Sequence, residues 1–274
     1  MDKTIVVTGA NGFIGRYLTE YFSKRNYKVI ALIHRAYKAA LPGVDYRLFE
    51  LDSFAGDVIP ENTIAVIHAA YIPYRKGNNS DERNLRATKR LLEFSRKKNV
   101  GKFVFLSSFS AMPDALSHYG QSKYRQEQLF DISKDLILRP ALVRGEGGLF
   151  RNIEKVIEKS GIIPLPGGGK QPVQLVDIDV LAKVIESSIE KDISGAYNIA
   201  SGNRLTVKEL YLDIAKSLNR KIRFVNIPFA LILPAIGLLS LFTENLPVTK
   251  ENILGLKQMA VRQPAGLKTV FGID

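Results

Sequence analysis

The stretch TIVVTGANGFIG, residues 4–15, decides the fold of this chain of 274 residues. Its first part, Thr4–Val7, is a continuous apolar and β-branched run, which is typical of a strand buried on both faces. Three glycines follow with the spacing G-x-x-G-x-x-G, and helical periodicity begins directly after the second one. Gly9 allows a tight turn, Gly12 lets the backbone approach a pyrophosphate, and Gly15 lets the helix pack closely on the strand. The free N–H groups of that helix N-terminus would face the phosphates, so the motif predicts a dinucleotide site.

Strand-like and helix-like segments alternate along the first half of the chain. Strands are expected at Thr4–Val7, Lys28–Ile33, Asp45–Leu51, Ile64–Ile67, Phe103–Leu106 and Leu136–Leu138. Helices are expected at Phe13–Arg25, Asn84–Arg96 and Tyr119–Ile132. Repeated strand–helix units favour an α/β fold of Rossmann type, a doubly wound parallel sheet with helices on both faces.

The second half indicates a smaller unit that interrupts this pattern. A glycine-rich loop spans residues 161–172. A strand at Val173–Val176, a helix near Val180–Ile189 and a strand at Ala196–Ile199 are expected to return to the first unit. We therefore assign residues 1–140 and 172–200 to a dinucleotide-binding domain. Residues 141–171 and 201–274 are assigned to a small C-terminal substrate-binding region.

The composition excludes several classes of chemistry. The chain has no cysteine, which excludes disulfides, thiolate metal sites and a cysteine nucleophile, and its three histidines do not predict a metal site. Lysine and arginine number 39 against 27 acidic residues, a formal charge of +12. Because no basic segment with interleaved aromatic residues accompanies this charge, it indicates phosphate-bearing ligands and no nucleic acid. The N-terminal apolar run is too short for a signal peptide, so a cytoplasmic location is expected.

One apolar stretch stands apart in the C-terminal region. No residue from Ile227 to Phe242 is charged, and the bases Arg220, Lys221 and Arg223 precede it. Its 16 residues include two prolines and fall short of the roughly 20 that span a bilayer. We expect a buried helix pair or a hydrophobic lid at 227–242. A peripheral membrane contact and a subunit interface are the alternatives.

In a dinucleotide-binding fold, the residue at the end of the second strand contacts the adenosine ribose. An acid there would accept hydrogen bonds from a 2′-hydroxyl, and a base would accommodate a 2′-phosphate. The strand ends in Ile33 followed by His34 and Arg35, with no acid. Arg35 is a good phosphate ligand, which favours NADP over NAD. In the alternative, Arg35 is a surface residue and NAD is used.

A serine, a tyrosine and a lysine form the second chemical motif. Tyr119 and Lys123 lie four residues apart, on one face of an expected helix, and Ser107 and Ser108 end the buried strand before it. Proton transfer to a carbonyl needs a phenol whose pKa is drawn toward neutrality, and a nearby ammonium favours the phenolate. A serine hydroxyl can hold the substrate oxygen.

The combination of TGANGFIG, LSSFS and YGQSK resembles the extended or atypical short-chain dehydrogenase/reductases, the NAD-dependent epimerase/dehydratase family. The resemblance implies that Tyr119 is the catalytic acid/base and that Ser108 positions the substrate oxygen. It also implies that Lys123 binds the nicotinamide ribose and lowers the pKa of the tyrosine. The other cofactor-binding residues implied are Gly9, Asn11, Gly12, Phe13, Ile14, Gly15, His34, Arg35, Leu51, Asp52, His68, Ala69, Ala70, Asn84, Ser107 and Pro140.

The chain also departs from the sugar-nucleotide epimerases of this family. Only ten residues separate Ser108 from Tyr119, and Ala141-Leu142-Val143 lacks the asparagine that many members use on the nucleotide diphosphate. The resemblance implies an NAD(P)-dependent oxidoreductase acting on a hydroxyl or keto carbon of a small substrate, such as a sugar nucleotide, as a 4-keto reductase or an epimerase. The alternative is a nucleotide-binding structural or regulatory protein, similar to a complex I accessory subunit, that docks a partner or membrane through 227–242.

The expected oligomeric state follows from the helix at 84–96. Many family dimers pair this helix with that at 119–132 through apolar outer faces. Here a charged stripe occupies the outer face, made of Arg83, Arg86, Arg90, Glu93 and Lys97. We therefore expect a monomer or a weak homodimer.

Overall fold

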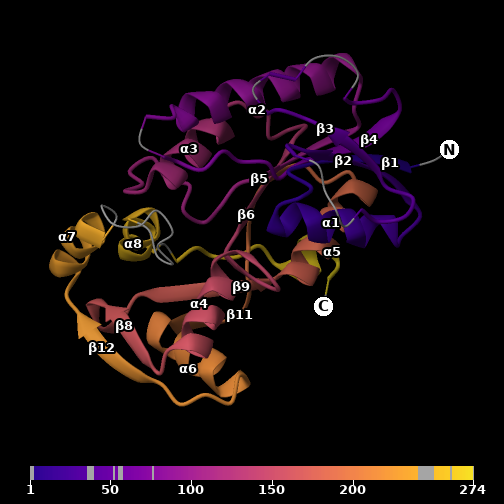
Figure 1. The fold of residues 1–274 in the computed structure, drawn as a ribbon. Helices are drawn as coiled ribbons and strands as arrows, with labels where there is room; N and C mark the ends of the chain where they lie inside the picture. Colours follow the sequence, from indigo (N-terminus) through magenta and orange to yellow (C-terminus); the bar gives the residue numbers. More distant parts are fainter. Residues whose placement is uncertain are drawn as a thin grey trace.

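A seven-stranded parallel sheet forms the centre of the protein. The computed structural model describes residues 3–35, 40–51, 53–54, 58–75, 77–239, 250–259 and 261–273. The strands of the sheet lie in the order β10-β6-β5-β4-β1-β2-β3 (Figure 1). Their bounds are β1 Lys3–Thr8, β2 Tyr27–Ile33, β3 Asp45–Leu48, β4 Thr63–His68, β5 Lys102–Leu106, β6 Leu136–Pro140 and β10 Gly195–Ile199.

Helices cover both faces of this sheet, and successive residues of β1 enter different cores. Ile5 and Val7 pack in the core beneath α1 (Phe13–Ser23) and α5 (Ile178–Glu190). Val6 packs in the opposite core, beneath α2 (Ser80–Lys97). Figure 1 shows α2 on one side of the sheet and α1 with α5 on the other. Double-sided burial explains the uninterrupted apolar run, and the predicted doubly wound α/β fold is confirmed.

Two predicted elements are shorter than the sequence indicated. The strand expected over Asp45–Leu51 ends at Leu48, although the Phe49 N–H still bonds to the Ile33 carbonyl of β2 at 2.8 Å and the Phe49 ring is buried. The helix expected to reach Ile132 is α3, His118–Glu127. Its continuation bends so that the Phe130 ring stacks on Phe105, with 4.8 Å between centroids.

The smaller unit contains two further sheets. β7 (Leu142–Arg144), β9 (Pro172–Asp177) and β11 (Ser201–Thr206) form one, and β8 (Ile162–Pro166) pairs with β12 (Arg223–Ile227) in the other. Four helices accompany them: α4 Gly148–Lys159, α6 Val207–Ser217, α7 Phe229–Leu239 and α8 Lys250–Lys257.

One part of the predicted division needs correction. The strand at 173–176 was expected in the first unit, but β9 pairs with β7 and β11. The place beside β6 is taken by β10, whose Gly195 lies opposite Leu136, so β9 has no edge to join there. α5 and β10 do pack in the first unit, as expected. The rest of the two-unit division stays a prediction.

The apolar stretch 227–242 is described as far as Leu239. Its helix α7 contains Pro234 and packs against α8, which lies beyond this stretch, so the buried helix pair or lid expected at 227–242 stays a prediction. Burial of α7 is incomplete, because Ile232 is 7% exposed but Leu231 is 62% exposed. Among the helices of the described residues, none combines the length and the apolar character that crossing a membrane requires.

The packing of α1 on β1 yields a test of stability. A Cβ at Gly15 would lie 2.2 Å from the Gly9 carbonyl oxygen, so Gly15→Ala is expected to lower the unfolding free energy by about 3 kcal/mol or more. The control is Gly255→Ala in α8, where a Cβ meets nothing within 4 Å. That change should raise the unfolding free energy by about 0.5 kcal/mol. Urea unfolding measures both, and equal effects would contradict the packing argument.

Candidate active site

The turn after β1 is built by close backbone approaches. Gly9 has φ +66°, and a Cβ there would lie 2.8 Å from the Cα of Ala70, at the end of β4. Gly12 is the N-cap of α1 and gives it no side-chain cap. The first N–H groups of α1 therefore remain available to an anion, as a pyrophosphate site requires.

A cavity of about 530 Å³ opens beside this turn, at the carboxyl ends of β1, β2 and β4. Seven predicted cofactor-binding residues line it: Gly9, Asn11, Gly12, His34, Leu51, Ala69 and Ala70. Sequence reasoning missed the other lining residues: Leu32, Phe49, Glu50, Tyr71, Ile72, Pro73 and Arg83. Glycine backbone at one end and an apolar slot at the other fit a dinucleotide. Arg35 is exposed and follows His34 without lining the cavity, and Asp52 lies outside the described residues.

His68 lies behind the cavity wall. It is completely buried, with Nδ1 2.7 Å from the Thr8 hydroxyl and Nε2 3.1 Å from the Thr88 hydroxyl. The Thr8 hydroxyl also accepts a hydrogen bond from the Ala70 N–H at 3.1 Å. Burial lowers the pKa of His68 to about 3, so the ring is neutral. Its contacts give this predicted residue a supporting place, holding β1 against the turn after β4.

Asn84 is also one layer removed from the cavity. Its side-chain oxygen accepts from the Ile72 N–H and its amide donates to the Ile72 carbonyl, both at 2.9 Å. Since Ile72 lines the cavity, this buried asparagine fixes the backbone of the lining loop. Phe13 instead packs on another loop, where a Cβ at Gly147 would lie 2.3 Å from its ring. Ile14 is half-buried against the core beneath α1.

The structure brings Ser108, Tyr119 and Lys123 together beside this cavity. Helix α3 begins at the N-cap Ser117, whose hydroxyl accepts from the Gly120 N–H at 3.1 Å. One turn of helix then places Tyr119 and Lys123 on the same side. The Ser108 side chain lies near the Tyr119 hydroxyl. Tyr71, which lines the cavity, packs edge-on against the Tyr119 ring with 5.0 Å between centroids.

Lys123 is buried, with 3% of its surface exposed. Its ammonium donates to the Leu106 carbonyl at 2.7 Å and lies 4.6 Å from the centre of the Phe105 ring. Burial lowers the pKa of Lys123 to about 7, and nearby Glu127 opposes this shift. The pKa of Tyr119 is raised by burial, and the neighbouring Ser108 side chain partly offsets the rise. The resemblance implied that Lys123 lowers the pKa of Tyr119, and this role stays a prediction.

A buried ion pair that sequence reasoning missed supports the serines. Ser107 donates to Glu127, and Arg139 holds both oxygens of that carboxylate, at 2.8 and 2.6 Å. The network joins β5, α3 and β6, so the strand end that carries Ser108 is fixed to the helix that carries Tyr119. Pro140 follows directly, and its carbonyl accepts from the Phe109 N–H at 3.1 Å.

The C-terminal segment closes the short loop between Ser108 and Tyr119. The Gln258 side chain accepts from the Leu116 N–H at 2.5 Å. Arg262 donates to the carbonyls of Phe109 and Ala111, at 3.1 and 2.5 Å. The Tyr119 N–H itself reaches Glu251 of α8 at 3.3 Å. The loop therefore depends on residues more than a hundred positions later in the chain.

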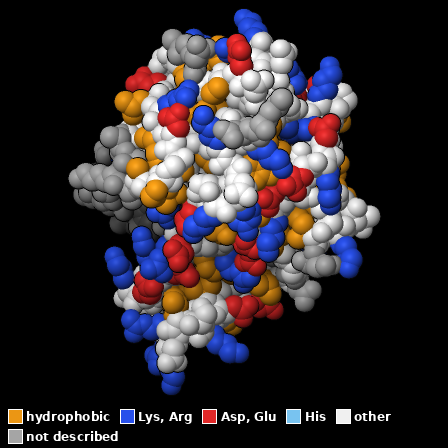
Figure 2. Space-filling view, turned by 90° about the vertical axis from the view of Figure 1, so that its right-hand side faces the viewer, with side chains coloured by type: hydrophobic (Ala, Val, Ile, Leu, Met, Phe, Trp, Pro, Cys, Tyr) orange, Lys and Arg blue, Asp and Glu red, His pale blue; other side chains and the backbone are white. Residues whose placement is uncertain are grey.

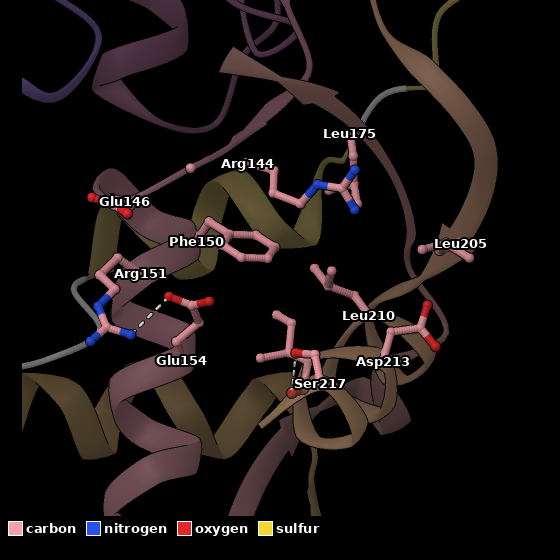
Figure 3. Close-up of a pocket in the computed structure, with 12 residues that line it drawn as sticks. Arg144, Glu146, Phe150, Arg151, Glu154, Leu175, Leu205, Leu210, Asp213 and Ser217 are labelled. Atoms are coloured by element: carbon pink, nitrogen blue, oxygen red, sulfur yellow. Dashed lines mark hydrogen bonds and ion pairs between the residues drawn. The ribbon is translucent and has the colours of Figure 1, made fainter. Parts of the chain in front are cut away.

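A second hollow, of about 760 Å³, lies in the smaller unit between α4 and α6 (Figure 3). It has an apolar floor that includes Phe150 and Leu210, and none of the predicted site residues lines it. Its arginines are paired, Arg144 with Asp177 at 2.7 Å and Arg151 with Glu154 at 3.0 Å.

Comparison with known sequences agrees with this geometry. The profile of the NAD dependent epimerase/dehydratase family matches residues 5–200. A UDP-glucose 4-epimerase of Vibrio cholerae is 24% identical over 80% of this chain and 77% of its own length. A putative UDP-glucose 4-epimerase of Methanocaldococcus jannaschii is 29% identical over 77% and 81%. An NADH dehydrogenase 1 alpha subcomplex subunit 9 of Dictyostelium discoideum is 26% identical over 81% of this chain and 65% of its own.

Solved structures share the fold. The UDP-glucuronic acid 4-epimerase of Bacillus cereus, with UDP-glucuronic acid and NAD, superposes with a TM-score of 0.72 at 20% identity, over 82% of this chain and 86% of its own. The UDP-glucose 4-epimerase of Thermotoga maritima, with UDP-glucose, gives 0.70 at 21% identity, over 82% and 85%. With the profile covering more than half of its length, the chain belongs to the NAD dependent epimerase/dehydratase family and is a nicotinamide-dependent enzyme.

Proposed function

We propose that this enzyme catalyses hydride transfer at a hydroxyl or keto carbon of a sugar nucleotide, as a 4-epimerase or a 4-keto reductase. The observation that carries the proposal is the grouping of Ser108, Tyr119 and the buried Lys123 beside the glycine-lined cavity. The relatives named UDP-glucose 4-epimerases support the substrate class. A bound nicotinamide would supply or accept the hydride at the substrate carbon.

The chain's own residues would handle the proton and the orientation of the substrate. With its pKa raised by burial, Tyr119 is protonated at neutral pH and can donate a proton to the keto oxygen of a substrate whose carbonyl carbon accepts the hydride. Ser108 would hold that same oxygen through its hydroxyl. Lys123 would bind ribose hydroxyls of the cofactor with the ammonium that now meets the Leu106 carbonyl.

A second candidate function is a cofactor-binding structural or regulatory role. The similarity to the Dictyostelium subunit favours it, as does the incomplete burial of α7. In that role the chain would bind the dinucleotide without turning substrate over. The grouping of the half-buried Ser108 and Tyr119 with the buried Lys123 supports the catalytic function over this one.

Tyr119→Phe tests the catalytic role. It removes the hydroxyl but keeps the ring that packs on Tyr71, so turnover of UDP-sugar substrates should fall by about 10²- to 10⁴-fold while cofactor affinity stays unchanged. Tyr124→Phe, later on the same helix, is the matched control and should leave turnover intact. Assays of UDP-glucose and of a 4-keto UDP-sugar, with cofactor binding by fluorescence, measure both. Tight cofactor binding without turnover in the unaltered chain would favour the structural role instead.

Arg35 tests the choice of cofactor. We propose that it contacts a 2′-phosphate beyond His34, which makes NADP the preferred cofactor. Arg35→Ala should then weaken NADPH binding about tenfold and leave NADH binding unchanged, since about 1.4 kcal/mol of a charged contact is lost. Lys28→Ala, an exposed base at the other end of β2, should change neither affinity. Equal NADPH and NADH affinities in the unaltered chain would remove this role.

Burial of Lys123 predicts a pH dependence of stability. Folded Lys123 has its pKa lowered to about 7, whereas an unfolded lysine titrates at roughly 10.4. From pH 7 to about 9.5 the unfolded chain binds more protons, so the unfolding free energy should rise by up to about 1.4 kcal/mol per pH unit. Lys123→Met should remove this rise, and Lys89→Met on the exposed face of α2 should keep it. Urea unfolding across this range measures the slope, and an unchanged slope in Lys123→Met would refute the argument.

A further inference from the structure

Among the described residues, one face of the ribbon of β8 and β12 is exposed. In the parallel register, Ile162 lies opposite Arg223 and Pro164 opposite Val225, so these four residues share a face. The alternate residues Ile163 and Phe224 pack in the small unit's core. The outward face is therefore apolar where a solvated strand would carry polar side chains.

The apolar side chains of this face are strongly exposed. Ile162 is 61% exposed, Val225 is 49% exposed, and Leu212 in the middle of α6 is 44% exposed. Leu231 on α7, which follows β12 directly, is 62% exposed. Single exposed apolar residues are ordinary, but a group along adjoining elements marks an interaction surface.

Basic side chains surround the same residues. Ile162 and Leu212 line a shallow groove together with Lys216, Arg220, Lys221 and Arg223, and no carboxylate is among the groove's described lining residues. We call these four bases with Ile162, Leu212 and Val225 the tip surface. Figure 2 shows Lys and Arg side chains projecting from the lower end of the molecule, where the small unit lies. The tip surface thus joins exposed aliphatic groups to an unbalanced positive charge.

We propose that the tip surface docks on an anionic lipid bilayer. Aliphatic side chains with a rim of bases are the combination that binds the boundary between acyl chains and acidic headgroups. A second copy of the chain fits less well, because a two-fold contact would set like charges against each other. Nucleic acid fits less well too, since the exposed apolar groups are aliphatic and offer no ring for base stacking. The tip surface would lie on the bilayer and would not cross it. None of the described helices is long and apolar enough to span a membrane.

Flotation of the purified full chain with vesicles tests the proposal. Vesicles of phosphatidylcholine mixed with phosphatidylserine should carry the protein at about 50 mM salt and release most of it at about 500 mM, as screening shortens the electrostatic range. Vesicles of phosphatidylcholine alone should carry at least tenfold less. Equal flotation with both kinds, or no flotation at low salt, would overturn the proposal.

Two double variants locate the contact. Lys221→Glu with Arg223→Glu should lower the vesicle-bound fraction at least tenfold. Lys89→Glu with Lys97→Glu, exposed bases of α2 in the other unit, lowers the net charge equally and should retain binding. Ile162→Ser with Val225→Ser should reduce binding while the charge stays constant, with circular dichroism to check the fold. An equal loss in both charge variants would show a non-specific effect of net charge and refute a docking site at the tip surface.

Discussion

Backbone-to-backbone contact at the turn after β1 holds three elements at one point. A side chain at Gly15 would overlap the Gly9 carbonyl, and one at Gly9 would meet Ala70. The start of α1, the end of β1 and the end of β4 are therefore locked together, at the place where the strand order reverses direction. A crevice must open there, because the connections from β1 and β4 leave toward opposite sides of the sheet. The cavity, its apolar slot and the nearby tyrosines all take their positions from this point.

A buried charge network adds the chemistry to that crevice. Lys123 would be unfavourable in the core without the Leu106 carbonyl and the nearby Glu127. Glu127 in turn is held by Arg139 and by Ser107. The charges therefore form one chain from α3 to β6, and removing Arg139 would leave the Glu127 carboxylate buried without its ionic partner. The same chain fixes the strand end beside Ser108, so electrostatic balance and the geometry of the site depend on each other.

The parts of this structure that local sequence determines were predictable. The strands could be located from the spacing and length of the apolar segments. A strand buried on both faces of a sheet needs a short continuous apolar segment, and Ile5 and Val7 belong to one. The four-residue spacing of Tyr119 and Lys123 likewise needs only a helix. Long-range pairings were not predictable: Tyr71 reaches Tyr119 across 48 positions, and Arg262 reaches Phe109 across 153. The sheet to which β9 belongs was misassigned for the same reason, since a strand does not encode its neighbour. The tip surface could not be predicted either, because the sequence does not show which apolar side chains are exposed to solvent.

The protonation of Tyr119 depends on which groups the nearby Lys123 ammonium contacts. In this state the Lys123 ammonium is used on the Leu106 carbonyl and the Phe105 ring, and burial raises the pKa of the phenol. In the proposed function, the free site would therefore donate a proton. An oxidised nicotinamide carries a positive charge and a reduced one carries none, so the phenolate would be favoured more beside the oxidised form. A base is needed when a hydroxyl is oxidised and an acid when a ketone is reduced. The same half-buried phenol would thus serve both directions, because the charge of the cofactor would set its protonation.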